Sequence, residues 1–224
     1  MSSAQSPRIE HLVLRPQELV GDQAFWAIYE ASFPPEEKDP PRVVLQTAEP
    51  SNGMVFCTRA EGRTLALATV QHLREVPYGF LIYLAVAPEC KGQGIGGALL
   101  NFASQTIESS APACHGLIWE VDRPQDAEDE AERNKRTRRL GFFQRHAGRL
   151  LEAPYLQPAL DGEHVVPMHL MTRLFAKSAP PDLGTINQMI QSIYFEKYAA
   201  MNGVSPLHLE DLLAGKIPPR PAFP

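Results

Sequence analysis

The stretch "LAVAPECKGQGIGGALL", residues 84–100, places four glycines between an apolar run and a helical pattern. The glycines stand at positions 92, 94, 96 and 97, and Ile95 and Leu99 share one face of the helix that follows. Backbone N–H groups of successive glycines can converge on an anion, a helix N-terminus adds positive potential, and Lys91 adds a cation. A turn that only packs a helix on a sheet would explain one or two of these glycines. The stretch therefore predicts a loop that binds a pyrophosphate.

A dinucleotide-binding loop is an alternative interpretation of the same glycines. Gly92, Gly94 and Gly97 satisfy the GxGxxG pattern, and the acidic Glu120 and Asp122 end the next expected strand, where a ribose-binding residue would stand. That pattern usually follows its strand directly and opens the domain, whereas residues 87–91 intervene here and about 80 residues precede. An NAD-binding oxidoreductase is therefore the second interpretation.

Strand and helix patterns alternate on both sides of the glycine loop. The expected order is a strand over 9–15, a helix over 22–33, a hairpin over 53–59 and 64–73, a central strand over 80–87, a strand over 116–121, a charged helix over about 126–146, and closing strands around 149–151 and 167–175. The central strand is apolar throughout, as expected for a strand covered on both faces. Residues 152–164 are expected to form a loop between the closing strands. The fold class expected from this order is α/β.

The overall composition excludes several classes of protein. The 224 residues are 44% hydrophobic, and the net charge of −5 argues against a general nucleic-acid or membrane-surface binder. Three cysteines without CxxC spacing suggest neither a disulfide framework nor a metal site. No stretch has the ~18 apolar residues of a membrane span. We therefore expect a cytoplasmic protein with a small cationic or neutral partner.

The composition changes near Ala176. "SAPPDLG" resembles a linker, and the residues after it mark an amphipathic helix whose face includes Ile186, Met189, Ile193 and Tyr194. This helix is expected to cover the chain's own core or, alternatively, to pair with another subunit, so the protein is expected to be a monomer or a homodimer. The expected domains are residues 1–175 and a helical, proline-rich extension over 176–224.

The glycine stretch resembles the acyl-CoA-binding motif of the GNAT superfamily of acetyltransferases. That motif is a Gln or Arg, two residues, Gly, one residue, then Gly or Ala, and Lys91, Gly94 and Gly96 stand at its positions here. Lysine in the first position is a departure that keeps the positive charge. The resemblance covers roughly residues 8–175 and implies a central, mostly antiparallel sheet with splayed central strands, flanked by helices.

The resemblance also implies a reaction and a cofactor site. The reaction is transfer of an acetyl or short acyl group from acetyl-CoA or another acyl-CoA to a primary amine by direct attack, without a metal. Leu84, Ala85 and Val86 would bind the pantetheine arm and the thioester carbonyl. The pyrophosphate would bind at Lys91, Gly92, Gln93, Gly94, Ile95, Gly96 and Gly97.

Glu120 is the expected general base. "WEV" at 119–121 resembles the "LEV" of ribosomal-protein alanine acetyltransferases, in which the glutamate is the base. A carboxylate in mid-strand beside a cleft would have its pKa raised by loss of solvation, which suits a base near neutral pH. A structural ion pair with an arginine of the charged helix is the alternative.

The proton donor for the leaving thiolate is harder to assign. Many relatives have a tyrosine in an FYxxxG segment, where "RLGFFQRHAG" has Phe143, and a phenyl ring cannot donate a proton. Tyr155 is the expected substitute, Tyr83 is a second candidate, and a reaction without an acid is possible in principle because a thiol near pKa 8.5 leaves readily. A non-catalytic acyl-CoA-binding protein is a further alternative. Acidic residues of the two loops that flank the acceptor side are expected to attract its ammonium: Glu36, Glu37, Asp39, Asp161 and Glu163.

Overall fold

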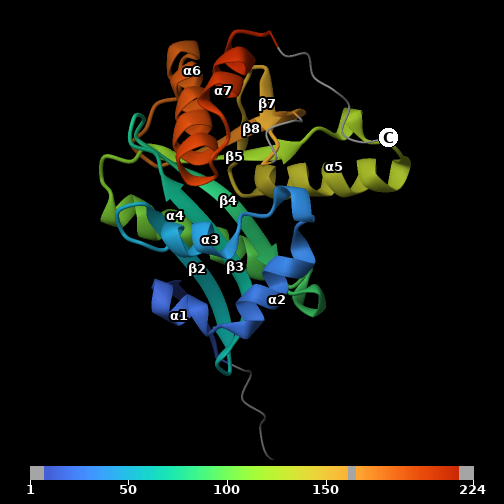
Figure 1. Cartoon of the computed structure of the whole chain (residues 1–224). Helices are drawn as coiled ribbons and strands as arrows, with labels where there is room; N and C mark the ends of the chain where they lie inside the picture. The colour runs from blue at the N-terminus through green and yellow to red at the C-terminus, as the bar shows by residue number, and fades with distance from the viewer. Residues whose placement is uncertain (1–7, 161–164, 217–224) are drawn as a thin grey trace, which may run out of the picture.

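A computed structural model describes residues 8–160 and 165–216, except for the side chain of Glu36. One sheet of eight strands runs through it in the order β1-β2-β3-β4-β5-β8-β6, with β7 also paired to β8 (Figure 1). Only the β4–β5 pair is parallel among the described strands. The strands are β1 (Ile9–Leu14), β2 (Gly53–Ala60), β3 (Arg63–His72), β4 (Tyr78–Val86), β5 (Gly116–Asp122), β6 (Arg149–Leu150), β7 (Tyr155–Pro158) and β8 (Val165–Leu174).

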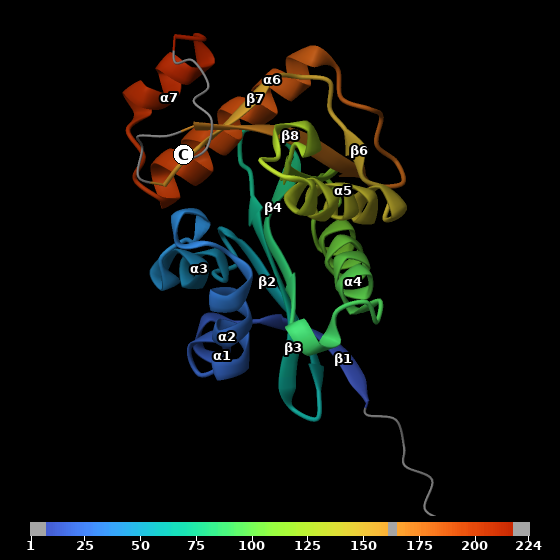
Figure 2. The same ribbon diagram turned by 90° about the vertical axis from the view of Figure 1, so that its right-hand side faces the viewer.

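Helices cover both faces of this sheet. Figure 2 shows α1, α2 and α3 on one side, with α4 and α5 on the other. The helices are α1 (Pro16–Val20), α2 (Gln23–Ser32), α3 (Pro41–Thr47), α4 (Ile95–Ser110), α5 (Glu130–Arg145), α6 (Leu183–Ser192), the π-helix η4 (Ile193–Met201) and α7 (Pro206–Leu213). Short 3-10 turns are η1 (Pro35–Glu37), η2 (Pro88–Cys90) and η3 (Pro124–Asp126). The expected mixed α/β, mostly antiparallel fold is confirmed.

The central strands splay, as the resemblance implied. β4 and β5 pair only where Tyr78–Phe80 lies beside Gly116–Ile118. Farther along, β4 continues to pair with β3, and a bulge at Ile82 shifts the register there. β5 pairs with β8 along its whole length, Gly116–Asp122, so residues 119–122 have a paired strand on that side only. The divergence of β4 and β5 opens a gap in the sheet beside Glu120. The antiparallel pairing of the other strands excludes the doubly wound parallel sheet that a dinucleotide-binding oxidoreductase would need.

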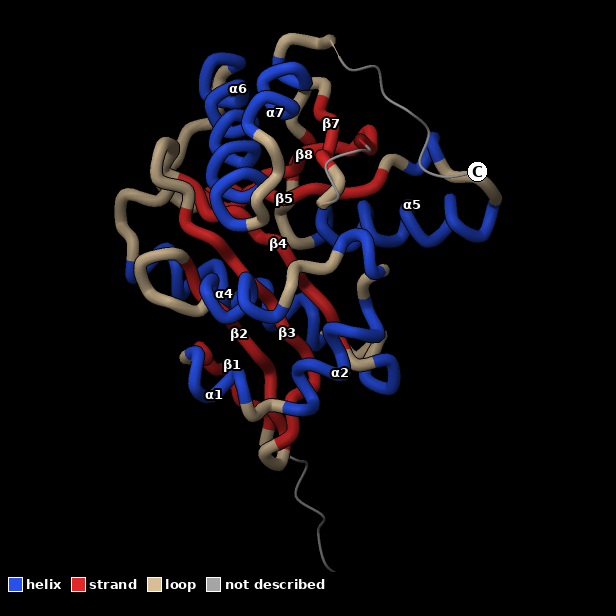
Figure 3. The backbone as a smooth tube through the Cα atoms, viewed as in Figure 1, coloured by secondary structure: helices blue, strands red, loops and turns tan. Residues whose placement is uncertain are grey.

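The C-terminal helices share a core with the strands. Ile186, Met189 and Ile193 pack in one hydrophobic cluster with Phe80 of β4 and Ile118 of β5. Figure 3 shows α6 and α7 beside β7 and β8, whose residues belong to the same cluster. The apolar face of the extension therefore covers the chain's own sheet. The domain boundary between residues 175 and 176 stays a prediction.

Two local expectations differ from the structure. The segment expected to be a loop over 152–164 contains β7, which pairs with β8 through backbone hydrogen bonds. The side chains of this segment show no pattern that predicts a strand. The charged helix begins at Glu130 rather than near Asp126, because η3 intervenes and the Asp129 side chain caps the helix by accepting from the N–H of Glu132 at 2.7 Å. Among the described residues, no helix is long and apolar enough to cross a membrane.

Candidate functional site

The glycine loop leads into the N-terminus of α4. Gly92 and Gly94 have φ angles of 78° and 79°, a left-handed conformation that glycine adopts without strain. Gly94 is the N-cap of this 16-residue helix, and no side chain within the described part of the chain caps it. The N–H groups of the first turn have no partners inside the helix. The loop therefore presents free donors and the positive end of a helix dipole.

These donors face a cavity of about 660 Å³. Its walls contain the residues that the resemblance assigned to the cofactor, except Gln93: Leu84, Ala85, Val86, Lys91, Gly92, Gly94, Ile95, Gly96 and Gly97. The Gln93 amide instead donates to the Glu89 carbonyl at 3.1 Å. One cavity thus joins the splayed end of β4 to the glycine loop.

Helix α5 supplies a wall of the same cavity that sequence reasoning missed. Arg138, Arg145 and His146 line it together with Phe142. A Cβ atom at Gly97 would lie 2.3 Å from the His146 ring, so glycine at this position permits the close approach of α4 and the ring. The sequence signal for this wall is the basic second half of α5, whose charges were expected to form a solvated helix face. Positive charge thus surrounds the cavity from two elements.

Glu120 lies on β5 beyond the point where β4 and β5 part, and three neutral groups hold its carboxylate. The Tyr155 hydroxyl donates to Oε1, the Gln157 amide donates to Oε2 at 2.7 Å, and the Tyr198 hydroxyl lies 2.9 and 3.0 Å from the two oxygens. The nearby Arg139 pairs with Asp122 at 3.4 Å. The alternative of a structural ion pair between Glu120 and an arginine of α5 is therefore wrong.

Burial determines the protonation of this cluster. Loss of solvation raises the pKa of Glu120, and the hydrogen bonds from Tyr155, Tyr198 and Gln157 only partly oppose this, as does the charge of Lys197. Burial and then the charge of Glu120 raise the pKa values of Tyr155 and Tyr198 well above their usual range. Both tyrosine hydroxyls therefore carry their protons in the resting protein.

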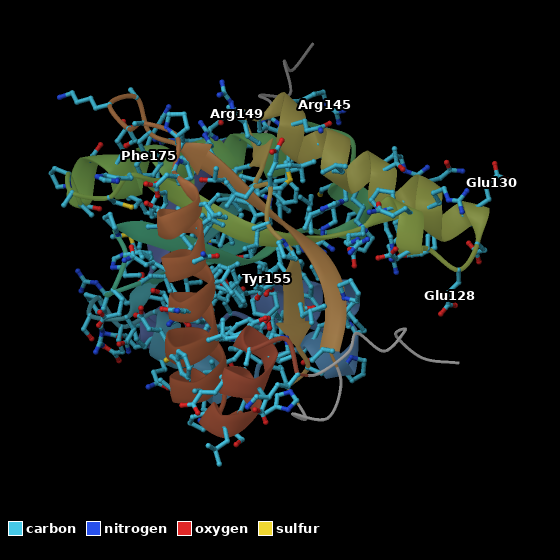
Figure 4. The ribbon with its side chains drawn as sticks, turned by 90° about the horizontal axis from the view of Figure 1, so that it is seen from above. Glu128, Glu130, Arg145, Arg149, Tyr155 and Phe175 are labelled. Carbon is cyan, nitrogen blue, oxygen red and sulfur yellow. The ribbon has the colours of Figure 1, made fainter. Side chains whose placement is uncertain are left out.

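A second cavity, of about 420 Å³, lies against Glu120. It has an apolar wall that includes Phe80, Ile82 and Met168, and a polar wall in which acidic residues outnumber basic ones. Phe33 and Arg139 line both cavities, so the two adjoin there. In Figure 4, Tyr155 lies in the middle of the molecule, whereas Glu128 and Glu130 lie at the outer end of α5.

Asp39, which was expected near the acceptor, and Tyr83, the second candidate for the proton donor, both have structural partners. The carboxylate of Asp39 lies 2.5 Å from the Lys197 ammonium and accepts from the Asn202 amide at 2.7 Å. The Tyr83 hydroxyl donates to the Glu37 carbonyl and accepts from the backbone N–H of Asp39, each at 2.8 Å. Both residues thus hold the loop between α2 and α3.

Phe143 is buried against Trp119, with ring centroids 4.9 Å apart. Asp161 and Glu163 lie outside the described residues. Lys197 and Tyr198 were missed, although they continue the apolar face that begins at Ile193 and Tyr194, and a lysine on such a face is a signal of a buried partner. No group of three or more His, Cys, Asp or Glu among the described residues could hold a metal.

The comparisons with known proteins agree with this geometry. The model of the "Acetyltransferase (GNAT) family" matches residues 22–131, a span that includes the glycine loop and Glu120. Residues 22–131, just under half of the chain, are therefore similar to the GNAT family of acetyltransferases. No curated protein matches the sequence.

Solved structures share the fold at low sequence identity. A GNAT-family acetyltransferase from Bacteroides thetaiotaomicron is 20% identical with a TM-score of 0.65, and the match covers 88% of this chain and 99% of that one. The ribosomal-protein-alanine N-acetyltransferase of Escherichia coli is 16% identical with a TM-score of 0.53, covering 79% and 98%. The PaiA N-acetyltransferase from Thermoplasma acidophilum, solved with coenzyme A, is 14% identical with a TM-score of 0.50, covering 75% and 99%.

Proposed function

We propose that the protein is an N-acetyltransferase that moves an acetyl or another short acyl group from acyl-CoA to a primary amine of a small molecule or peptide. One observation carries the proposal: the free N-terminus of α4 and the Glu120 carboxylate line two cavities that meet at Phe33 and Arg139. Phosphates suit the first cavity and an ammonium suits the second.

The cofactor would bind along the first cavity. The N–H groups of Gly94 to Gly97 and the charge of Lys91 would hold the pyrophosphate, because both favour an anion. Leu84, Ala85 and Val86 would hold the pantetheine arm along the edge of β4 that β5 leaves open. When bound, the thioester supplies an activated acyl carbonyl at the gap between the strands.

Glu120 would act as the general base. Its raised pKa gives it a proton affinity closer to that of the acceptor, so it takes the proton of the ammonium and frees the lone pair for attack. Tyr155 is the proposed proton donor to the departing thiolate. Its hydroxyl donates to Glu120, so the proton that the carboxylate takes up can replace the one that Tyr155 gives away.

A panel of amines tests the proposal, with release of CoA thiol from acetyl-CoA as the measurement. We expect at least one primary amine to release thiol with the wild type, and Glu120→Gln to lower kcat/KM by 10²-fold or more, as loss of a general base does. Binding of acetyl-CoA without thiol release for any amine would favour a non-catalytic acyl-CoA-binding protein, which the buried Phe143 would suit. Unchanged turnover in the variant would remove Glu120 from the mechanism.

A further inference from the structure

Helix η4 brings two consecutive residues into the acceptor cavity. Lys197 and Tyr198 both line it, although they lie far along the chain from the family match at residues 22–131. The helix has π geometry, with i→i+5 hydrogen bonds, which is rare and occurs frequently at functional sites. The C-terminal segment is thus part of the cavity wall.

The two residues reach different parts of the site. Lys197 donates to Asp39 in the loop between α2 and α3, and it also lies 2.7 Å from the Asn202 amide oxygen in the turn that ends η4. Tyr198 donates to Glu120 in the middle of β5. One helix therefore links the acceptor loop to the carboxylate.

We propose that Tyr198 is a positioning residue that orients Glu120 and sets its proton affinity, and that η4 thereby completes the acceptor site. The proposal rests on the proposed function in one respect, the role of Glu120 as base. The other part of the proposal, that the Tyr198 hydroxyl holds the Glu120 carboxylate, does not depend on turnover.

The geometry of Tyr198 differs from that of the other two donors. Tyr155 and Gln157 both belong to β7, and each binds one carboxylate oxygen. The Tyr198 hydroxyl lies within 3.0 Å of both oxygens, so it constrains the rotation of the carboxylate about its last bond. Loss of this hydroxyl leaves the carboxylate held from β7 alone.

The three basic residues that line the same cavity as Glu120 are each paired with another carboxylate. Lys197 pairs with Asp39, Arg139 with Asp122, and Arg136 with Glu132. The Tyr155 hydroxyl donates to Glu120 itself, and the Tyr194 hydroxyl donates to the Leu156 carbonyl at 2.5 Å. Hydrogen bonds to a carboxylate favour its charged form. Removal of the Tyr198 hydroxyl is therefore expected to raise the pKa of Glu120, with no nearby unpaired cation in the described part of the chain to compensate.

Tyr198→Phe tests the proposal, and Tyr194→Phe is its matched control. Each change removes one buried hydroxyl from η4, but only Tyr198 contacts Glu120. The direct measurement is a carbon-13 NMR titration of the full chain labelled at glutamate carboxyls, with the Glu120 signal identified by its absence in Glu120→Gln. We expect Tyr198→Phe to raise the pKa of Glu120 by about one unit, a tenfold rise in proton affinity, and the control to leave it unchanged.

Turnover gives a second readout. In Tyr198→Phe, the acidic limb of the profile of kcat/KM against pH is expected to move to higher pH, by the same amount as the pKa measured by NMR. KM for acetyl-CoA is expected to stay the same, because Tyr198 is outside the cofactor cavity. A merely structural role would lower activity without moving the limb. If the wild type acetylates no amine, the proposed function fails, and the NMR titration still decides the role of Tyr198.

Two outcomes would overturn the inference. One is an unchanged pKa of Glu120 in Tyr198→Phe, and the other is an equal shift in Tyr194→Phe, which would make the effect one of helix packing. If Tyr198→Phe does not fold, a fluorinated tyrosine placed at 198 keeps the ring and makes the hydroxyl a stronger donor. The expected shift then has the opposite sign, a lower pKa of Glu120, and its absence would equally contradict the proposal.

Discussion

At the scale of single residues, Glu120 shows how burial adapts a carboxylate for chemistry at a cost in stability. Its pKa in the folded protein is raised above the usual value, so its contribution to stability is complete below the unfolded pKa and is lost as the pH rises through the folded pKa. The folded state is therefore expected to weaken as the pH rises above the usual glutamate pKa. At a given pH the same shift raises the protonated fraction of Glu120 above that of an ordinary glutamate.

Glu120→Gln should remove this pH dependence. The free energy of unfolding of the variant, relative to the wild type, is expected to improve as the pH rises from about 4.5, by about 1.4 kcal/mol for each unit of the pKa shift. Urea denaturation at a series of pH values measures it. Glu132→Gln is the control of opposite sign, because hydrogen bonds from Arg136 and Lys135 outweigh its desolvation and lower the pKa of Glu132. A pH-independent difference for Glu120→Gln would show that the carboxylate is not buried as described.

A substitution at Gly94 tests whether the loop binds the cofactor pyrophosphate, and a control at another glycine of the same φ separates the effect of charge from that of backbone strain. Gly94→Glu places a carboxylate at the mouth of α4, where it would repel a pyrophosphate, and acetyl-CoA binding measured by calorimetry is expected to be lost. Gly62→Glu in the β2–β3 turn is the matched control, since its φ of 77° almost equals the 79° of Gly94 and neither site has an atom within 4 Å of an added Cβ. Equal loss of binding in both variants would point to backbone strain instead of charge.

At the scale of elements, the buried pair of Lys197 and Asp39 joins η4 to the loop after α2. Both side chains are 3% exposed or less, and burial lowers the pKa of Lys197. Removal of one partner leaves the other charge buried, which costs about 3–5 kcal/mol, whereas removal of both charges can be nearly neutral. The pair therefore specifies where η4 lies more than it adds to stability.

Lys197→Met should accordingly destabilise the protein by about 3–5 kcal/mol in urea denaturation, and Lys197→Met with Asp39→Asn should restore most of that loss. The exposed pair of Lys216 and Asp211 gives a control, because Lys216→Met is expected to leave the transition midpoint unchanged. A double variant as unstable as the single one would mean that Lys197 contributes by packing alone.

The elements also show what the sequence could predict. The glycine loop, α4 and the β2–β3 hairpin follow from local patterns, since glycine spacing and hydrophobic period act over a few residues. The partners of Glu120 could not be predicted in this way, because Tyr198 lies 78 residues away and β7 was expected to be loop. Helix η4 has a helical pattern, and nothing local distinguishes its π geometry from an α-helix.

At the scale of the whole molecule, the question is whether residues 1–175 fold without the extension. The sequence places a domain boundary there, whereas the structure buries Ile186, Met189 and Ile193 with strands of the main sheet. Burial of each such side chain contributes about 1.5–3 kcal/mol, so the three together approach the whole stability of a typical domain. The extension is then expected to be necessary for folding as well as for the site.

A chain that ends after Phe175 should therefore lose its cooperative unfolding transition, because Phe80 and Ile118 would face water. A chain that ends after Lys216 keeps every described residue and is expected to unfold at the temperature of the full chain. Calorimetry or circular dichroism during heating measures both. A cooperative transition in the shorter chain would establish residues 1–175 as a domain. If that shorter chain also bound acetyl-CoA, cofactor binding would be separated from the acceptor site. The glycine loop would belong to that domain alone, and η4 would be an addition that serves the acceptor side, where Tyr198 holds Glu120.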